Sequence, residues 1–172
     1  MEEQFSHAAA QKDVINLLSA TNDKTSSRRR NTLSRREILR GFNVFNEVYA
    51  KGKSLYASFL SCRIVEQKEI SNQHLPTDIP VLVGFSVSRS VRTAVARNRL
   101  KRLMRETFRT QKHKLIECCV RENLQLILLF SFYKKTELPL KKFPFLFIDK
   151  DMNELLAKIV LQISVRDKEN NL

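Results

Sequence analysis

The sequence lacks several features on which large classes of protein depend. It has no Trp, so its eleven Phe must supply much of the large apolar volume of a core. Its three Cys form no C-x-x-C pair and its three His are far apart, so we expect neither a disulfide framework nor a metal site. No apolar run approaches the roughly 18 residues of a membrane span. The N-terminal MEEQ has no signal-peptide character, so we expect a cytoplasmic protein with no membrane partner.

Acidic residues are almost missing from one stretch. Between Arg89 and Lys114 there are ten Lys or Arg and one acid, Glu106, so this stretch carries nine of the thirteen net positive charges. A solvated helix face normally mixes both signs, because like charges one turn apart repel. A sequence that accepts this repulsion suggests an anionic partner, and a pI near 10.0 favours nucleic acid. A merely solvated basic face is the alternative.

The same stretch has the periodicity of a helix with two faces, which we expect over Thr93–Cys118. The apolar face should pack against a core. It contains Leu100, Leu103, Met104, Thr107 and Phe108. The cationic face recurs every four residues as Arg97, Lys101, Arg105 and Arg109, with Asn98 and Arg102 beside it. A row of guanidinium groups suits phosphates, because each offers a planar fork of donors to phosphate oxygens.

The order of the predicted elements indicates an α/β (α+β) two-layer sandwich with about four strands and three helices, in the order αβββαβα. Strands are clearest at 59–65, 80–88 and 124–130, and the last is apolar enough to be covered on both faces. The first helix is expected at Phe42–Lys51 with Gly52 as its stop. Ser34–Glu37 has the form of a capping box, but Gly41 would interrupt a helix begun there, and a second capping box at Asp151–Glu154 is predicted to open the last helix.

The predicted domain covers residues 32–166. Residues 1–31 are expected to be a flexible extension and 167–172 a short tail. Polar loops are expected at 66–78 and 134–147. One face of the strand at 80–88 carries Gly84 and Ser86, small residues that would suit the close approach of another molecule's backbone.

The segment Arg97–Glu106, RNRLKRLMRE, resembles the protein subunit of bacterial ribonuclease P. That family has an R-N-R-x-K-R-x-x-R-E helix, preceded by a strand ending in S-V-S-[KR] and then by A-V. The counterparts here are Ser86–Arg89 and Ala94-Val95. The family's upstream F-x-x-V-[FY]-x-x-G helix is matched by Phe45, Val48, Tyr49 and Gly52. The resemblance covers roughly Leu33–Val165.

The resemblance implies a role as well as a fold. The chain would be the RNA-binding subunit of the endonuclease that removes the 5′ leader from precursor tRNA, in a 1:1 complex with a catalytic RNA. Its partners would be that RNA and the precursor tRNA. The RNA would use magnesium ions, and the protein would supply no catalytic residue and no metal ligand. The resemblance also implies a left-handed parallel crossover, an exception to the usual right-handed rule.

Clustering and resemblance together assign ten residues to the catalytic RNA. They are Ser88, Arg89, Arg92, Arg97, Asn98, Arg99, Lys101, Arg102, Arg105 and Arg109. The start of a helix also favours anions, because its N–H groups are unpaired there. The family usually has Lys at position 90 and often Gly at 92, so with Ser90 and Arg92 we expect one phosphate contact to have moved. Two alternatives stay open: Asn98 as a local cap, and Arg99 as a brace between the helix and the sheet.

Six residues are predicted to line a cleft for the leader. They are Phe42, Phe45, Tyr49, Phe59, Ser61 and Arg63. Aromatic rings stack on unpaired bases without needing a particular sequence. An aromatic stripe at helical spacing is equally typical of a core. That alternative stays open for Phe45 and Tyr49, and it is favoured over the cleft for Phe42.

The same residues also bear on three other classes of function. A ribosomal or other structural RNA-binding protein would share the charge pattern. A helix-turn-helix DNA-binding protein is disfavoured, because the basic helix follows a strand without a short partner helix. A protein-only nuclease would need clustered carboxylates to hold its metal ions. The basic face offers only Glu106, which we expect to pair with Arg102, Arg105 or Arg109.

Overall fold

The computed structural model describes residues 32–71, 75–133 and 143–170, with side chains described up to residue 165. The flexible extension predicted over 1–31 lies outside these residues, as do 134–142 of the second predicted loop and the last two residues of the tail.

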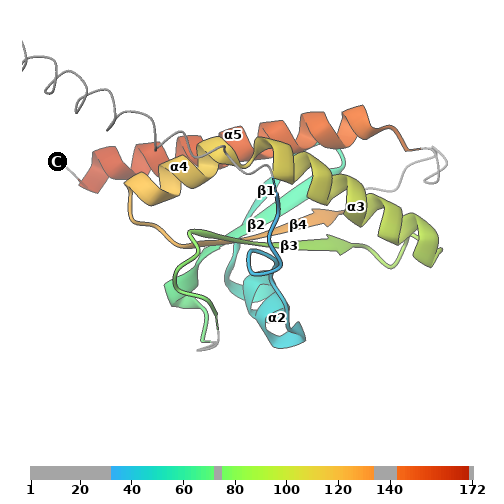
Figure 1. Ribbon diagram of the computed structural model, residues 1–172, viewed down its shortest axis with the longest axis horizontal. Coiled ribbons are helices and arrows are strands. Elements are labelled where there is room, and N and C mark those ends of the chain that lie inside the picture. The colour runs from blue at the N-terminus through green and yellow to red at the C-terminus, as the bar shows by residue number, and fades with distance from the viewer. Residues whose placement is uncertain (1–31, 72–74, 134–142, 171–172) are drawn as a thin grey trace, which may run out of the picture. The chain divides into compact units, whose positions relative to one another are not determined.

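A four-stranded mixed sheet forms the centre of the fold (Figure 1). Its strands are β1 (Lys53–Tyr56), β2 (Leu60–Glu66), β3 (Val81–Val87) and β4 (Leu126–Phe132), in the order β1-β2-β4-β3. β1, β2 and β4 pair antiparallel in turn, and β3 pairs parallel with β4. The predicted strands are therefore confirmed, although the last begins and ends two residues later than expected.

Helices cover both faces of this sheet (Figure 1). Helix α2 (Phe42–Lys51) packs on one face through Val44 and Val48. Helices α3 (Ala94–Gln111), α4 (His113–Arg121) and α5 (Phe145–Asn170) pack on the other. α5 runs past residue 166, where the domain was expected to end. With the short 3-10 helix η1 (Gln67–Glu69), the order matches the expected one except that two helices replace the single basic helix.

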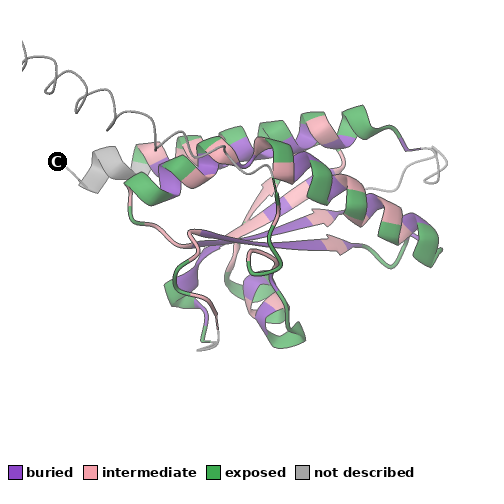
Figure 2. Ribbon diagram, viewed as in Figure 1, coloured by how far each residue is buried: buried purple, intermediate pink, exposed green. Residues whose placement is uncertain are grey.

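Strand β4 is buried on both faces, as its continuous apolar run predicts (Figure 2). Ile127 and Leu129 pack in the smaller core with α2. Leu126, Leu128 and Phe130 pack in the larger core with α3, α4 and α5. This burial places the two sides of the sheet in different surroundings, one under a single helix and one under three.

The predicted single basic helix is interrupted at Lys112. This lysine is buried, and its ammonium donates to the carbonyl of Thr32, 2.8 Å away, and to the carboxylate of Glu37. A buried ammonium is costly unless it is paired, so the turn at Lys112 is positioned by residues more than seventy positions earlier. α4 then continues as a separate helix.

The last helix does not begin at the predicted capping box. α5 begins at Phe145, and Asp151 lies buried within it. The Asp151 carboxylate accepts hydrogen bonds from the backbone N–H groups of Phe59 and Leu60, at 2.6 and 2.9 Å. Asp151 therefore caps the start of β2 across the core instead of its own helix.

The segment Ser34–Glu37 forms a turn instead of a helix. The Glu37 carboxylate accepts from the N–H of Ser34 at 2.5 Å, as in a capping box, but the N–H of Leu39 then donates to the Val83 carbonyl of β3 at 2.9 Å.

The close approach predicted at Gly84 is made by side chains of this chain and not by another molecule. A Cβ there would lie 2.9 Å from a Leu129 methyl and 3.1 Å from the ring of Phe45.

Candidate nucleic-acid interface

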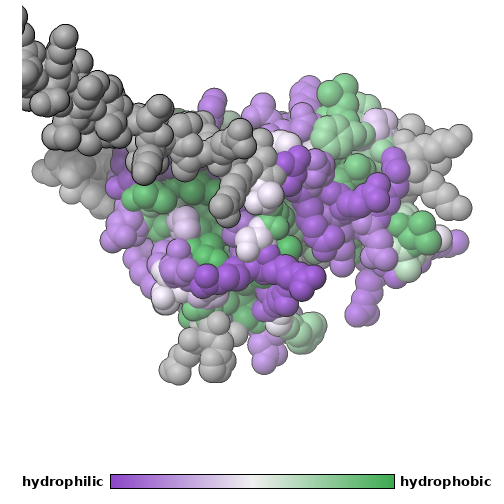
Figure 3. Space-filling model, viewed as in Figure 1, coloured by the Kyte–Doolittle hydropathy of each residue, from purple (hydrophilic) through white to green (hydrophobic). Residues whose placement is uncertain are grey.

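Helix α3 presents its cations along one side, as its periodicity predicts. Its N-terminus is capped by Thr93, whose hydroxyl accepts from the N–H of Ala96 at 3.3 Å. Leu100, Met104 and Phe108 are buried against the sheet, which turns the opposite side outward. Figure 3 shows hydrophilic residues gathered over α3 on the side in view.

The cations of α3 are not equivalent. Asn98, Arg102 and Arg105 are exposed, whereas Arg97, Lys101 and Arg109 are half-buried. Among the described residues, the side chains of Asn98, Lys101 and Arg102 have no hydrogen-bond or ion-pair partner. The local cap considered for Asn98 is therefore not formed within that part of the chain, and these groups are available to a ligand.

Arg97 is committed to the loop before the helix. Its Nη1 donates to the carbonyls of Val91 and Arg92, at 2.7 and 3.0 Å. Arg105 instead lies over the ring of Phe85, with its guanidinium carbon 6.0 Å from the ring centroid. The four-residue repeat thus contains one cation that braces the loop, the exposed Arg105, and two half-buried cations, Lys101 and Arg109.

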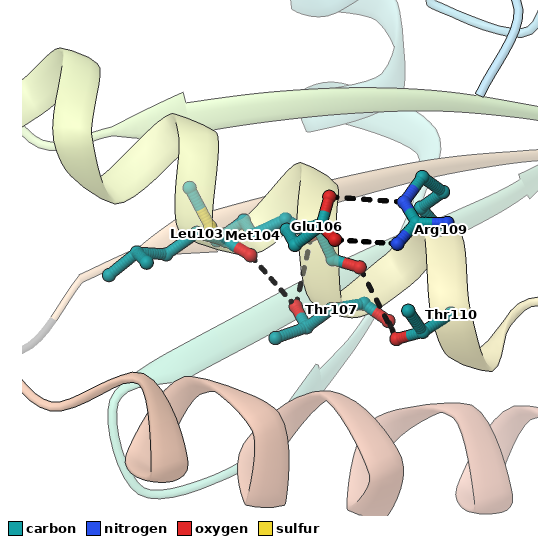
Figure 4. Close-up of polar contacts among 6 residues, drawn as sticks. All are labelled: Leu103, Met104, Glu106, Thr107, Arg109 and Thr110. Carbon is teal, nitrogen blue, oxygen red and sulfur yellow. Dashed lines mark hydrogen bonds and ion pairs between the residues drawn. The ribbon is translucent and has the colours of Figure 1, made fainter. Parts of the chain in front are cut away.

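The single acid of this stretch pairs with Arg109, one of its three predicted partners (Figure 4). Arg109 donates through Nη2 and Nε to the two Glu106 oxygens, at 2.5 and 3.0 Å. These bonds lower the pKa of the Glu106 carboxyl and raise the pKa of Arg109. Thr107 and Thr110 bond to helix carbonyls, so they compete for neither group. Arg109 therefore offers less to an RNA than its position suggested.

Arg99 lies on the side of α3 that faces α5. Its Nη2 donates to the Phe143 carbonyl at the long distance of 3.5 Å, and its Nε is buried without a hydrogen-bond partner in the described chain. Arg99 therefore contacts the segment before α5, and within the described residues it forms no hydrogen bond to the sheet, against which it was predicted as a brace.

The loop from β3 into α3 is organised by Ser88. Its hydroxyl accepts from the N–H and the hydroxyl of Ser90, at 3.2 and 2.9 Å, and its carbonyl accepts from Val91. Arg89 and Arg92 on either side are exposed, and their side chains have no hydrogen-bond or ion-pair partner among the described residues. Ser90 therefore shapes the loop, and Arg92 supplies an exposed cation near the helix start.

The second predicted site lies on the opposite face of the sheet. We call it the aromatic surface, consisting of Phe42, Phe45 and Tyr49 of α2 with Ser61 and Arg63 of β2. Phe42 is 79% exposed and Tyr49 37%, whereas Phe45 is half-buried over Gly84. Phe42 therefore offers the most ring surface to a ligand, and Phe45 serves mainly in packing.

Arg63 links the two elements of the aromatic surface. Its Nη1 donates to the Tyr49 carbonyl at 2.7 Å, and its guanidinium carbon lies 5.3 Å from the Tyr49 ring centroid. The Tyr49 hydroxyl is 3.1 Å from the Ser131 hydroxyl of β4. Sequence reasoning missed Ser131, because the predicted strand ended at residue 130. Extending the alternation of Ile127 and Leu129 by one step would have placed Ser131 on this face.

Phe59 does not belong to the aromatic surface, which corrects the prediction. Its ring lies in the larger core on the other face of the sheet. The centroid of this ring is 5.1 Å from that of Phe143 and 5.7 Å from that of Phe147. The reason is that Phe59 precedes β2 and its backbone is held by Asp151 of α5. Five of the six predicted cleft residues remain together.

The described residues contain no group of three or more His, Cys, Asp or Glu placed to hold a metal ion. None of the helices in the described ranges is both long enough and apolar enough to cross a membrane. The protein offers the cations of α3 on one side of the sheet and the exposed rings of the aromatic surface on the other. This combination fits an anionic, single-stranded polymer.

Comparisons with known proteins agree on one family. The family model described as Ribonuclease P matches residues 33–160. The "Ribonuclease P protein component" of Chlorobium phaeobacteroides is 39% identical over 90 residues, which make up 52% of this chain and 60% of that protein. The protein of the same name from Chlorobaculum tepidum is 40% identical over 96 residues, 52% of this chain and 57% of the relative. The chain thus spans less than two thirds of the length of these relatives.

Two solved structures share the fold. The RNase P protein of Staphylococcus aureus has a TM-score of 0.53 at 23% identity, covering 72% of this chain and 94% of that one. The RNase P protein of Thermotoga maritima has a TM-score of 0.53 at 22% identity, covering 70% and 94%. At these identities the likeness concerns the arrangement of helices and strands.

Proposed function

The chain belongs to the ribonuclease P protein family, and from this premise we propose that it is the RNA-binding subunit of an endonuclease that removes 5′ leaders from precursor tRNA. A catalytic RNA is its partner, in a 1:1 complex, and the precursor tRNA is the substrate. The observation that carries this proposal is the row of cations that α3 presents to solvent, on a chain whose described residues form no carboxylate cluster.

Helix α3 is the proposed contact with the catalytic RNA. Lys101, Arg102 and Arg105 project from one rigid helix. The backbone therefore loses little conformational entropy when these side chains bind several phosphates. Arg89 and Arg92 extend this row at the helix start, where the helix dipole also favours anions. Arg97 and Ser88 hold the loop that positions them.

The aromatic surface is the proposed contact with the leader. A leader is single-stranded, so its bases are open to stacking on Phe42 and Tyr49. Arg63 places a positive charge beside Tyr49, where it can attract the leader's phosphates. The sheet separates the two surfaces, which lets one protein hold the catalytic RNA and the substrate leader at once.

Magnesium does not fit the protein residues described. Mg²⁺ requires oxygen ligands arranged octahedrally, usually including carboxylates. The one acid of the basic helix, Glu106, is bonded to Arg109. In this proposal the RNA holds the ions, and the protein contributes binding and orientation alone.

The dependence of RNA binding on salt tests the role of α3. Replacing Lys101, Arg102 and Arg105 together with Ala should weaken binding of the catalytic RNA and flatten the slope of log K against log salt. The expected change is about 2 to 3, at roughly 0.7–0.9 for each phosphate that the protein no longer neutralises. Arg97 is kept, because its removal would disturb the loop that it braces.

A control variant removes the same charge elsewhere. Arg36, Lys68 and Arg121 each form an ion pair with an acid, and replacing these three with Ala should leave the slope nearly unchanged. Equal slopes for both folded variants would mean that α3 contributes only general charge, which would contradict its role as the RNA contact.

A further inference from the structure

Two tyrosines form an exposed pair beyond the aromatic surface. Tyr56 ends β1 and Tyr133 directly follows β4, and their ring centroids lie 5.8 Å apart with the planes at 78°. Tyr56 is 56% exposed and Tyr133 42%. An edge-to-face pair leaves ring faces open to solvent, so this pair can accept a further flat partner.

The pair lies on the same face of the sheet as the aromatic surface. Tyr56 is opposite Ser61 in the β1–β2 ladder, and Ser61 is opposite Ser131 in the β2–β4 ladder. Residues directly opposite each other share a face. Because the Tyr49 hydroxyl contacts Ser131, that face is the one that α2 covers.

Tyr133 reaches this face by the alternation of an extended chain. It follows Ser131 by two residues, and its N–H still bonds to the Phe59 carbonyl at 3.2 Å. Alternate residues of a strand point the same way and lie roughly 6.5 Å apart. The path from Tyr49 over Ser131 to the tyrosine pair is therefore one short step along the sheet.

The position of the pair is fixed from several sides. The Tyr133 hydroxyl donates to the Ala57 carbonyl at 3.0 Å, and the Lys158 ammonium donates to the Tyr56 carbonyl at 2.9 Å. Asp151 caps the two amides on the far side of the same turn. Rings held in place before binding lose little freedom when a ligand arrives.

We propose that the Tyr56–Tyr133 pair is a second stacking site, which takes an unpaired base of single-stranded RNA next along the strand from the bases on Phe42 and Tyr49. The inference rests on the proposed function and extends it. Stacking tolerates any base, since every base has a π-face. The pair would therefore increase affinity with leader length without selecting a leader sequence.

The experiment measures the affinity of the reconstituted protein–RNA complex for precursor tRNAs whose leaders are lengthened one nucleotide at a time. In the Tyr56→Ala complex, long leaders should bind about 5- to 150-fold more weakly, while leaders too short to pass Tyr49 should bind as in the wild type. Tyr56→Phe should keep the full affinity, and Tyr56→Leu, which keeps apolar bulk without a π-face, should lose most of it.

Two further variants separate stacking from folding. Tyr133→Phe removes the bond to Ala57 but keeps the ring, so it should retain leader affinity. Leu161→Ala, at an exposed position of α5, should change affinity for no leader. Thermal unfolding of each variant checks that the fold is intact.

The outcomes are distinct. If folded Tyr56→Ala or Tyr56→Leu binds every leader as the wild type does, the tyrosine pair only stabilises its turn and the inference is overturned, while leader binding by the wild type upholds the proposed function. If wild-type affinity does not depend on the leader at all, the proposed leader contact fails and the second stacking site fails with it.

Discussion

Replacing Phe42 and Phe45 with Ala, one at a time, separates RNA binding from packing on α2. The two residues lie on the same helix three positions apart, yet their surroundings differ. Phe42 is 79% exposed, whereas the Phe45 ring packs over Gly84 in the smaller core. The pair therefore provides a matched comparison of aromatic residues with opposite expected effects.

The expected changes in stability and affinity follow from how far each ring is buried. Phe42→Ala should cost under about 0.5 kcal/mol of unfolding free energy, as for most surface changes. It should reduce affinity for a leader-bearing precursor by roughly 1–3 kcal/mol, the range for one base stacked on one ring. Phe45→Ala should reduce stability by roughly 2–3 kcal/mol, somewhat below the range for a fully buried Phe.

The assay combines denaturant unfolding of each variant with binding of precursor and mature tRNA by the reconstituted complex. For Phe42→Ala, the weaker binding should appear with the precursor and not with mature tRNA, which has no leader. A Phe42→Ala complex that loses equal affinity for both RNAs, or a Phe45→Ala protein with unchanged stability, would refute the assignment of binding to one ring and packing to the other.

Other parts of the fold allow further tests. Lys112→Met leaves the Glu37 carboxylate without its buried partner and should lower the unfolding free energy by about 3 kcal/mol in urea titrations. A change below about 1 kcal/mol would mean that this ion pair does not hold the turn between α3 and α4 in place. Gly84→Ala forces a methyl group against Leu129 and should cost about 1–3 kcal/mol by the same measurement. Burial raises the pKa of the Cys119 thiol to about 12, so a thiol reagent at neutral pH should label it only after unfolding, and rapid labelling of the native protein would contradict this burial.

Local patterns predicted the elements whose causes are local. The alternation in β3, the continuous apolar run of β4 and the two-faced pattern of α3 each reflect burial of neighbouring residues, and the structure confirms them. Gly52 follows the last residue of α2 as expected, and a Cβ added at this position would lie 2.5 Å from the Val48 carbonyl oxygen, so glycine is the residue that fits there.

The failures share a different cause, which is contact between distant residues. Lys112 interrupts the basic helix through Glu37, and Asp151 caps amides about ninety residues earlier in the chain. Both side chains are also compatible with the local patterns that were predicted, so periodicity could not have distinguished the two outcomes. Phe59 lies on the opposite face of the sheet from the predicted one for the same reason, since its backbone N–H is held by Asp151.

We propose that this protein binds RNA and leaves the chemistry to its RNA partner. The most direct measurement is 5′ processing of precursor tRNA in magnesium, first with nuclease-treated, RNA-free protein and then after addition of a ribonuclease P RNA transcribed from the same genome. We predict no cleavage by the protein alone and leader removal by the complex at moderate salt. Sustained processing by the RNA-free protein would mean that the protein itself carries out the cleavage, contrary to the role proposed for it.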